Sequence, residues 1–426
     1  MPLTTEQQSA SDFCLHVLTR QADTRQCVLA GYAGAGKTYT TQSICRTLID
    51  SGYNIAALAH THKALSVLSE KMPGGVSCMT IASALGWRFD SRTQSMKQTG
   101  KHKLHLFDCV IVDESSMVDD DMMQGIQRAT DARKTPVLWV GDPAQVPPVG
   151  FAESPVWSRI THQTRLTEIA RQAEGSPIIE AAHHIRQCID EGVRPDFSLF
   201  SRWADDEAVT VIPSGGRSVI SEYVASAIES GIECRVVCHT NKAVEQVNRM
   251  VMSRLHPPGS GDFVPGDTVY FSGRFDFSET EWAPTDCEAI ICSVDDEDDS
   301  YGILGIPCYK MTAQVDGVGE RQIWVPKDKT HLFAAKKHLS NQAYNAKRRN
   351  DTLARQEAQA ALAEIAATYA DTRHIYAGTV HKAQGSTYEA VIVDWADINK
   401  CSDDLQFSRL LYVAVTRPSK YLIVVG

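Results

Sequence analysis

The sequence lacks an apolar run of the roughly 18 residues that a membrane-spanning helix needs. Its first residues, Met1 to Gln8, are polar and lack the basic start and apolar middle of a secretory signal peptide. No Cys-x-x-Cys pair occurs, and several of the 12 cysteines lie in apolar runs that predict buried strands. Cys287 and Cys292 have no second pair at zinc-site spacing. We therefore expect a cytoplasmic protein without a membrane contact, a disulfide framework or a metal cluster.

An excess of positive charge is also missing. The net charge of −10 argues against a uniformly basic nucleic-acid coat. It leaves room for a local basic groove, because charges are screened over about 10 Å at ordinary salt. The fractions of 43% hydrophobic and 22% charged residues are those of a globular protein, and 426 residues suggest roughly two to four domains.

The most specific pattern is the octet from Gly31 to Thr38, which fits G-x-x-x-x-G-K-[ST]. An apolar run precedes it and a helical pattern follows it, so a strand, a loop and a helix N-terminus are predicted. Such a loop aims backbone N–H groups at phosphate. Lys37 would reach the β- and γ-phosphates, and the Thr38 hydroxyl would bind Mg²⁺. The glycines that would let phosphate approach the backbone are Gly31, Gly34 and Gly36.

Two α/β segments are predicted. In residues 1–165, apolar runs at 54–59, 107–112 and 136–140 alternate with helical patterns, and polar residues follow each run. Such strands indicate a parallel sheet covered on both faces, with ligands at the carboxyl ends of its strands. The second segment comprises 166–256 and 373–426. Its predicted strands lie at 208–212, 234–238, 390–394 and 421–425.

The pattern breaks between residues 257 and 372. Short β-type runs separated by glycine, proline and acidic turns predict a small β-barrel inserted into the second α/β segment. Residues 331–370 then predict a helical arm that is basic in its first part. A basic helical stretch is either a solvated face or a nucleic-acid contact, and the sequence leaves both open.

Several side chains fit phosphoryl transfer. Asp113 and Glu114 follow an apolar strand, so one carboxylate would hold Mg²⁺ and the other would orient the attacking water. Gln145 follows the next strand and can sense the γ-phosphate. Arg171 and Arg417 are the candidates for the arginine that neutralises the transition state from across the site.

The segments Thr379–Thr387 and Leu411–Arg417 resemble the last two motifs of superfamily 1 helicases, nearest to the RecD-like branch and its compact Dda-type phage helicases. The resemblance runs through nearly the whole chain in the family's order. His60 and Pro418 depart from the residues that the family usually has there. The resemblance implies two RecA-like P-loop domains, with ATP and Mg²⁺ at their interface and single-stranded DNA crossing both. It also implies an ATP-dependent DNA helicase that moves 5′→3′ in replication or recombination.

The resemblance also assigns residues by position. Gln7 is similar to the family's adenine-reading glutamine, with Gln8 as the alternative. The implied ATP-site residues beyond the loop glycines are Lys37, Thr38, Asp113, Glu114, Gln145, Arg171, Gly385 and Arg417. The positions at which the family touches or couples to DNA are Thr61, His62, Lys63, Thr80, Thr240, Asn241, Thr379, His381 and Lys382.

By position, residues 87–108 correspond to the family's strand-separating pin, and 257–372 to the accessory domain that grips it. Trp87, Phe89 and Trp282 either stack on bases or are core aromatics. The expected partners are single-stranded DNA, duplex junctions and a single-strand-binding protein, and the expected state is a monomer. The alternatives are the motor subunit of a recombination nuclease complex, an RNA helicase and an ATP-driven nucleoprotein remodeller. A nuclease would have to be a partner, because no spaced carboxylate cluster lies outside the motor motifs.

Overall fold

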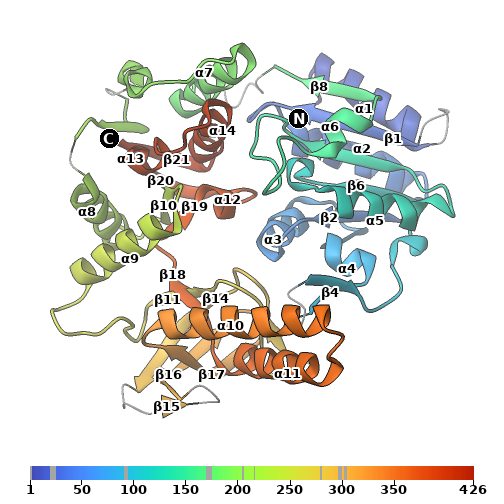
Figure 1. Cartoon of the computed structure of the whole chain (residues 1–426). Helices are drawn as coiled ribbons and strands as arrows, with labels where there is room; N and C mark the ends of the chain where they lie inside the picture. Colours follow the sequence, from blue (N-terminus) through green and yellow to red (C-terminus); the bar gives the residue numbers. More distant parts are fainter. Residues whose placement is uncertain are drawn as a thin grey trace. The chain divides into compact units, whose positions relative to one another are not determined.

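The computed structural model describes residues 2–19, 25–90, 95–168, 175–203, 206–214, 216–278, 281–295, 300–301 and 305–426 (Figure 1). The chain divides into two compact units. The first consists of Met1–Gly86, Gly100–Leu255 and Tyr376–Gly426, and the second of Trp87–Thr99 and His256–Ile375. Among the described residues, no helix combines the length and apolar character of a membrane span.

The first unit contains a six-stranded parallel sheet in the order β3-β2-β6-β7-β1-β8. Its strands are β1 (Gln26–Gly31), β2 (Ile55–Ala59), β3 (Val76–Thr80), β6 (Cys109–Val112), β7 (Val137–Gly141) and β8 (Gln163–Leu166). The helices between them are α1 (Thr5–Leu18), α2 (Lys37–Asp50), α3 (His62–Lys71), α4 (Ile81–Leu85), α5 (Asp120–Asp131) and α6 (Pro155–Arg159). Four of the strands match the predicted apolar runs, whereas the edge strands β3 and β8 were not predicted.

Burial explains why the central strands were recognisable. Every residue of β2, β6 and β7 is buried, so these strands are apolar throughout. On one face, Ile44 and Leu48 of α2 and Val17 of α1 pack against Leu29 and Leu138 of the sheet. The helical spacing of these α2 side chains is the one that the sequence shows.

The same unit contains a second parallel sheet, in the order β19-β10-β20-β21-β9. Its strands are β9 (Val209–Ile212), β10 (Cys234–Cys238), β19 (Ala377–Thr379), β20 (Tyr388–Asp394) and β21 (Pro418–Val425). Its helices are α7 (Pro177–Glu191), α8 (Gly216–Glu229), α9 (Asn241–Leu255), α12 (Val380–Ala383), α13 (Trp395–Ile398) and α14 (Asp404–Val415). Two parallel sheets covered by helices agree with the predicted two-domain P-loop fold.

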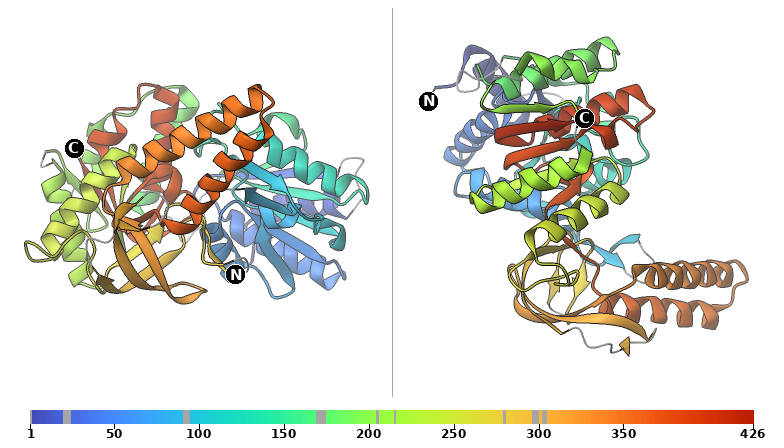
Figure 2. Two further views of the ribbon diagram at one scale, coloured as in Figure 1. Left: turned by 60° about the horizontal axis from the view of Figure 1, so that its bottom comes forward. Right: turned by 90° about the vertical axis from the view of Figure 1, so that its left-hand side faces the viewer.

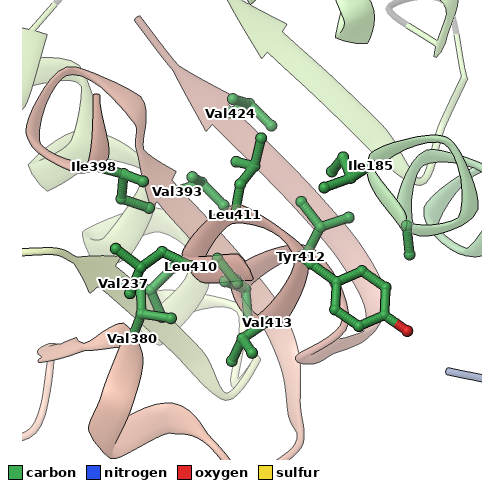
Figure 3. Close-up of a cluster of buried hydrophobic side chains, with 14 of the residues drawn as sticks. Ile185, Val237, Val380, Val393, Ile398, Leu410, Leu411, Tyr412, Val413 and Val424 are labelled. Carbon is green, nitrogen blue, oxygen red and sulfur yellow. The ribbon is translucent and has the colours of Figure 1, made fainter. Parts of the chain in front are cut away.

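Helix α14 is the centre of the second sheet's core. Leu410, Leu411, Tyr412 and Val413 are all buried on it, among side chains from β10, β20, β21 and α7 (Figure 3). A helix that is apolar on nearly every side is held from all directions. Helix α14 therefore fixes the position of Arg417, two residues beyond its end.

The second unit is built on an antiparallel sheet in the order β15-β16-β14-β11-β18, with β17 also paired to β16. Its strands are β11 (Thr268–Phe271), β14 (Glu288–Asp295), β15 (Ser300–Tyr301), β16 (Ile306–Val315), β17 (Gly319–Pro326) and β18 (Thr372–His374). The separate pairs are β12 (Phe275–Asp276) with β13 (Trp282–Ala283), and β4 (Trp87–Asp90) with β5 (Ser95–Gln98). The β4–β5 hairpin falls where the sequence predicted a pin. The predicted domain limits stay a prediction.

The predicted helical arm is two helices, α10 (Lys329–Arg348) and α11 (Thr352–Thr368), which lie side by side in Figures 1 and 2. The break lies at 349–351. There Asn350 has a left-handed φ of 55°, and Asp351 caps α11 by accepting from the Ala354 N–H at 3.0 Å. A left-handed residue ends a helix, and an aspartate cap starts the next one. The helical spacing of the side chains continues on both sides of the break, so the sequence predicted a single arm.

A buried carboxylate, Asp397, organises the end of β10. Its Oδ2 accepts from the backbone N–H groups of His239 at 2.9 Å and Thr240 at 2.7 Å. Lys400 donates to its Oδ1 at 2.8 Å. Burial alone would raise the pKa of Asp397, but the hydrogen bonds from Lys400 and Thr240 hold that pKa below its usual value. The carboxylate thus fixes the turn that leads into α9.

Replacing Asp397 by alanine is expected to lower the free energy of unfolding by about 3 kcal/mol, because buried N–H groups lose their acceptor. The measurement is the shift of the denaturant midpoint. The control is Asp403→Ala, which removes an exposed cap that accepts from the Gln406 N–H at 2.7 Å and should cost about 1 kcal/mol. Equal shifts for the two variants would contradict the role given to Asp397.

Candidate nucleotide and nucleic-acid site

The phosphate loop joins β1 to α2. Gly36 precedes the helix with a left-handed φ of 81°, and the Lys37 side chain turns back over the loop. Its Nζ donates to the carbonyl oxygens of Gly31 at 2.8 Å and Tyr32 at 3.0 Å. Thr38 follows in the first turn of α2 and is half-buried. The loop therefore has the predicted strand–loop–helix context, with the lysine ammonium beside its backbone.

Gln7 lies against this loop and Gln8 does not. The buried Gln7 side chain donates from Nε2 to the Ala35 carbonyl at 3.2 Å and closes a capping box with Thr4. Gln8 is exposed and donates to Asp12 at 2.8 Å, on the same helix. A Cβ atom at Gly36 would come within 2.4 Å of Gln7 Nε2. Alanine at 36 would therefore be strained by its backbone angle and would displace the Gln7 amide.

The carboxylates follow β6. Burial raises the pKa of Asp113 to about 7, and the charge of Glu114 adds to the rise. Glu114 has a left-handed φ of 48°, an unusual angle for a residue with a side chain. Among the described residues no group of three acidic, histidine or cysteine side chains converges to hold a metal by itself. A site with one such carboxylate suits Mg²⁺, because this ion takes most of its ligands from water and phosphate.

Asp142, at the end of β7, joins the two α/β segments of the unit. Its fully buried carboxylate accepts from Arg186 of α7 at 2.5 Å and from the Tyr412 hydroxyl of α14 at 2.6 Å. The Tyr412 oxygen in turn accepts from the backbone N–H of Ala33, in the phosphate loop, at 3.0 Å. The Arg186 guanidinium also lies 4.6 Å from the centre of the Tyr32 ring. The phosphate loop is therefore linked directly to two helices of the second segment.

Gln145 takes part in a second link. Its Oε1 accepts from Gln384 Nε2 at 3.0 Å and from the Ser116 hydroxyl at 3.5 Å. Gln384 lies just beyond α12, and its amide also donates to the Val146 carbonyl at 3.3 Å. All three polar side chains are buried. The next residue, Gly385, has a left-handed φ of 78°, and a Cβ there would lie 3.3 Å from that of Ala64 in α3.

The two candidate arginines differ. The buried Arg417 donates to the carbonyls of Val413 and Ser386, each at 3.1 Å, and to the Thr416 hydroxyl at 2.9 Å. These acceptors all belong to the second α/β segment, so its guanidinium joins the end of α14 to the turn after Gly385. Arg171 lies outside the described residues.

Four of the predicted DNA positions are threonines that cap helices. Thr61, Thr80 and Thr379 accept from the backbone N–H groups of Ala64, Ser83 and Lys382 at 3.1, 3.2 and 3.4 Å. Thr240 accepts from the Ala243 N–H at 3.1 Å. Thr80 is paired with Ala59 across β3 and β2, and Thr379 with Cys238 across β19 and β10. Each parallel sheet thus has two threonine-capped turns on adjacent strand ends.

The hydroxyl hydrogens of these threonines are not all used alike. A hydroxyl has one donor and two acceptor positions, and each cap uses an acceptor. Thr240 also donates to Asp397, 3.1 Å away. The Thr240 hydroxyl therefore uses both its donor and an acceptor position inside the protein. The cap bonds of Thr61, Thr80 and Thr379 use an acceptor position only, so their O–H groups can donate to another acceptor.

The remaining predicted DNA residues lie on the same turns. His62 and Asn241 are exposed at the starts of α3 and α9, and Lys382 is half-buried on α12. Lys63 Nζ lies 4.9 Å from the centre of the Tyr388 ring, on β20. Burial lowers the pKa of His381, and the nearby His239 lowers it further.

Sequence reasoning missed Asp142, Arg186, Gln384 and Tyr412, although three of them stand inside or beside motifs that it singled out. Asp142 lies two residues after a predicted strand, and Tyr412 lies in an apolar run where a hydroxyl needs a partner. Both positions could have indicated a polar side chain with a buried partner. Arg186 had no such signal, because a lone arginine in a helix gives no indication of its acceptor.

Family models match two parts of the chain. One described as an AAA domain covers residues 3–194, and one described as a UvrD-like helicase C-terminal domain covers residues 374–425. The chain is 34% identical over 173 residues to the ATP-dependent RecD2 DNA helicase of Deinococcus radiodurans, which covers 39% of this chain and 22% of that protein. It is 26% identical over 257 residues to the ATP-dependent DNA helicase Dda of Enterobacteria phage T4, which covers 56% of this chain and 54% of that protein. The chain thus matches between about a fifth and a half of the length of these relatives.

Solved structures show the same fold. The Pif1 helicase from Bacteroides in complex with ADP-AlF3 and single-stranded DNA has a TM-score of 0.55 at 18% identity, covering 100% of this chain and 93% of that one. Pif1 from Candida albicans has a TM-score of 0.52 at 17% identity, covering 100% and 94%. The fold and the phosphate loop define a P-loop protein with two RecA-like domains. Within that class, the chain resembles superfamily 1 helicases, and its relatives include RecD2 and Dda.

Gly36→Ala is expected to weaken nucleotide binding by at least about tenfold, because the new methyl group must displace Gln7 and distort the loop. The matched control is Gly52→Ala. Gly52 has a similar φ of 83°, but its Cβ position is open. Both variants should lose about 1 kcal/mol of stability to the backbone angle. Titration with a fluorescent ATP analogue measures the difference, and equal binding by the two variants would contradict the contact with Gln7.

Proposed function

We propose that the chain is an ATP-dependent DNA helicase that moves 5′→3′ along single-stranded DNA and unwinds the duplex ahead. The observation that carries this proposal is the pair of hydrogen-bonded links between the two RecA-like domains. Tyr412 joins the phosphate loop to α14, and Gln384 joins Gln145 to α12. The Gln384 link leads to α12, the helix that Thr379 caps, and the Tyr412 link leads to α14. A change at the nucleotide would thereby reach the surface proposed to hold the strand.

The proposed ATP site uses Lys37 for the β- and γ-phosphates and Gln7 for the base. Thr38 and Asp113 would hold Mg²⁺, which neutralises phosphate charge when bound. Glu114 would then accept a proton from the attacking water. Burial raises the pKa of Asp113, and Glu114 follows it with a left-handed backbone, so the two side chains leave the strand end in different directions. Such a difference suits a metal ligand beside a general base.

We propose Arg417 and Arg171 as the arginines that neutralise negative charge on the phosphate in the transition state. The Arg417 guanidinium is held by backbone carbonyls of its own domain, so it would have to exchange them for phosphate oxygens as ATP closes the domains. Carbonyl acceptors are neutral, and a charged phosphate competes well with them. Gly385, beside Ser386, lets the chain turn where this exchange takes place.

The proposed DNA track crosses the capped turns of both sheets. The hydroxyls of Thr61, Thr80 and Thr379 would donate to phosphate oxygens, while Lys63 and Lys382 supply charge. His62, Asn241 and His381 would line the same path, and Thr240 would position α9 through Asp397. Contacts to phosphate make binding dependent on salt and nearly independent of sequence.

The second unit is proposed as the accessory domain. Its sheet would act as the small barrel and the β4–β5 hairpin as the pin, which belongs to the same compact unit. Trp87 is a candidate for stacking, and the side chain of Phe89 lies outside the described residues. Trp282 is partly covered, because Arg274 lies 4.5 Å from its ring centre. We further propose a monomer that works beside a single-strand-binding protein, in replication or recombination.

The test is ATP turnover with and without single-stranded DNA, followed by unwinding of matched duplexes that carry a 5′ or a 3′ overhang. We expect DNA to stimulate turnover strongly and only the 5′ overhang to support unwinding. The control, Lys37→Ala, should bind DNA normally and turn over no ATP. Turnover that ignores DNA, or unwinding from the 3′ overhang only, would contradict the proposal. Stimulation by RNA alone would favour an RNA helicase.

A further inference from the structure

Positive charge is concentrated on one segment of this acidic chain. Residues 329–349 contain six lysines or arginines and no aspartate or glutamate, although the whole chain has a net charge of −10. The segment is helix α10 with the residue that follows it. With 52 acidic and 42 basic residues in the whole chain, an average helix here would carry more acidic than basic side chains. The sequence therefore gives this helix a charge unlike that of the rest of the protein.

One side of α10 is used for packing. Leu332 is buried and Leu339 is half-buried, and both contact a cluster that contains Ile365 of α11 and Ile306 of β16. Lys336 lies toward this side, and burial lowers the pKa of its ammonium. Lys329, at the start of α10, also pairs with Asp371 at 2.6 Å and donates to the Thr372 carbonyl at 2.8 Å. The packing of the helix thus accounts for Lys329 and Lys336 but not for its other four basic residues.

The opposite side presents aromatic rings between basic groups. Phe333 and Tyr344 are 50% and 61% exposed, and they lie about three turns apart on the same side of the helix. Lys337, Lys347 and Arg348 fall on the same side and are exposed as well. An exposed aromatic ring is unfavourable in water, and two such rings on one charged stripe fit a ligand that offers both flat apolar faces and negative charge.

We propose that the outer face of α10, comprising Phe333, Lys337, Tyr344, Lys347 and Arg348, binds single-stranded nucleic acid by stacking of bases on the rings and pairing of phosphates with the basic groups. The distance between Phe333 and Tyr344 along the helix, about 16 Å, accommodates several nucleotides between the rings. A duplex would leave the rings unused, since its bases are already stacked. An acidic protein segment would match the charge but not the spaced rings.

This proposal rests on the proposed function only for the nature of the ligand, because the site lies outside the ATPase motifs. The probe is a fluorescein-labelled oligothymidine of about 30 nucleotides, whose binding is measured by anisotropy at several salt concentrations. Removing three phosphate contacts by K337Q, K347Q and R348Q together should reduce the slope of log Kd against log salt concentration by about 2. F333A and Y344A should each weaken binding by about tenfold and leave the slope unchanged.

Two controls match these changes. R46Q with K134Q removes exposed positive charge from the first RecA-like domain, and L353A truncates a side chain on α11 that is 66% exposed. Both controls should bind like the unmodified protein. Wild-type affinity and slope in the α10 variants, with DNA-stimulated ATP turnover intact, would overturn this proposal alone. An equal loss of binding to heparin and to oligothymidine, with no effect of F333A or Y344A, would also overturn it and would indicate a general polyanion surface. Absence of any DNA stimulation in the unmodified protein would instead count against the proposed helicase function.

Discussion

The buried carboxylate of Asp142 ties the two α/β segments of the first unit together. It has no exposed surface, and its acceptor positions are taken by Arg186, Tyr412 and the Ala144 N–H. Leaving a buried charge unpaired costs about 3–5 kcal/mol, so these partners keep their places. Burial and the negative charge of Asp142 raise the pKa of Tyr412 well above its ordinary value, and its hydroxyl therefore stays protonated and donates. The same oxygen accepts from Ala33, which ties the phosphate loop to α14.

Through this hydrogen bond the eight-residue phosphate loop can influence α14, which lies far from it in the sequence. Helix α14 is packed on nearly every side, so it moves as a body with the second sheet or not at all. Arg417 follows α14 and is hydrogen-bonded to the turn after Gly385. That turn also contains Gln384, which contacts Gln145 on the first sheet. The phosphate loop, Gln145 and the candidate arginine Arg417 are thus all hydrogen-bonded to α14 or to the turn after α12.

The sequence was informative wherever one residue type is needed for a local physical reason. The phosphate loop, the apolar central strands and the carboxylates after β6 follow from glycine geometry, burial and metal chemistry. Strands β3 and β8 were missed because half-buried edge strands carry polar residues such as Ser77 and Gln163. The partners Asp142 and Arg186 lie 44 positions apart, and no periodicity or spacing rule connects them.

The second unit was also only partly predictable from the sequence. Its β content was recognisable from turn residues, but β16, the strand that carries most of the pairing, was not predicted, and Asn350 divides the helical arm unexpectedly. The charge of α10 was visible in the sequence, whereas its division into a packed side and an aromatic-basic side required the structure. Tertiary contacts decide which face of an amphipathic segment is available to a ligand.

The most direct test of the account is a double-mutant cycle between Asp142 and Tyr412, measured as ATP turnover at saturating single-stranded DNA. Asp142→Asn and Tyr412→Phe each remove the charged hydrogen bond, so each should slow turnover by at least about tenfold. If the two side chains act as one link, the double variant should be no slower than the slower single variant. Multiplication of the two effects would show that Asp142 and Tyr412 act independently, and it would contradict the proposed coupling between the phosphate loop and the second domain.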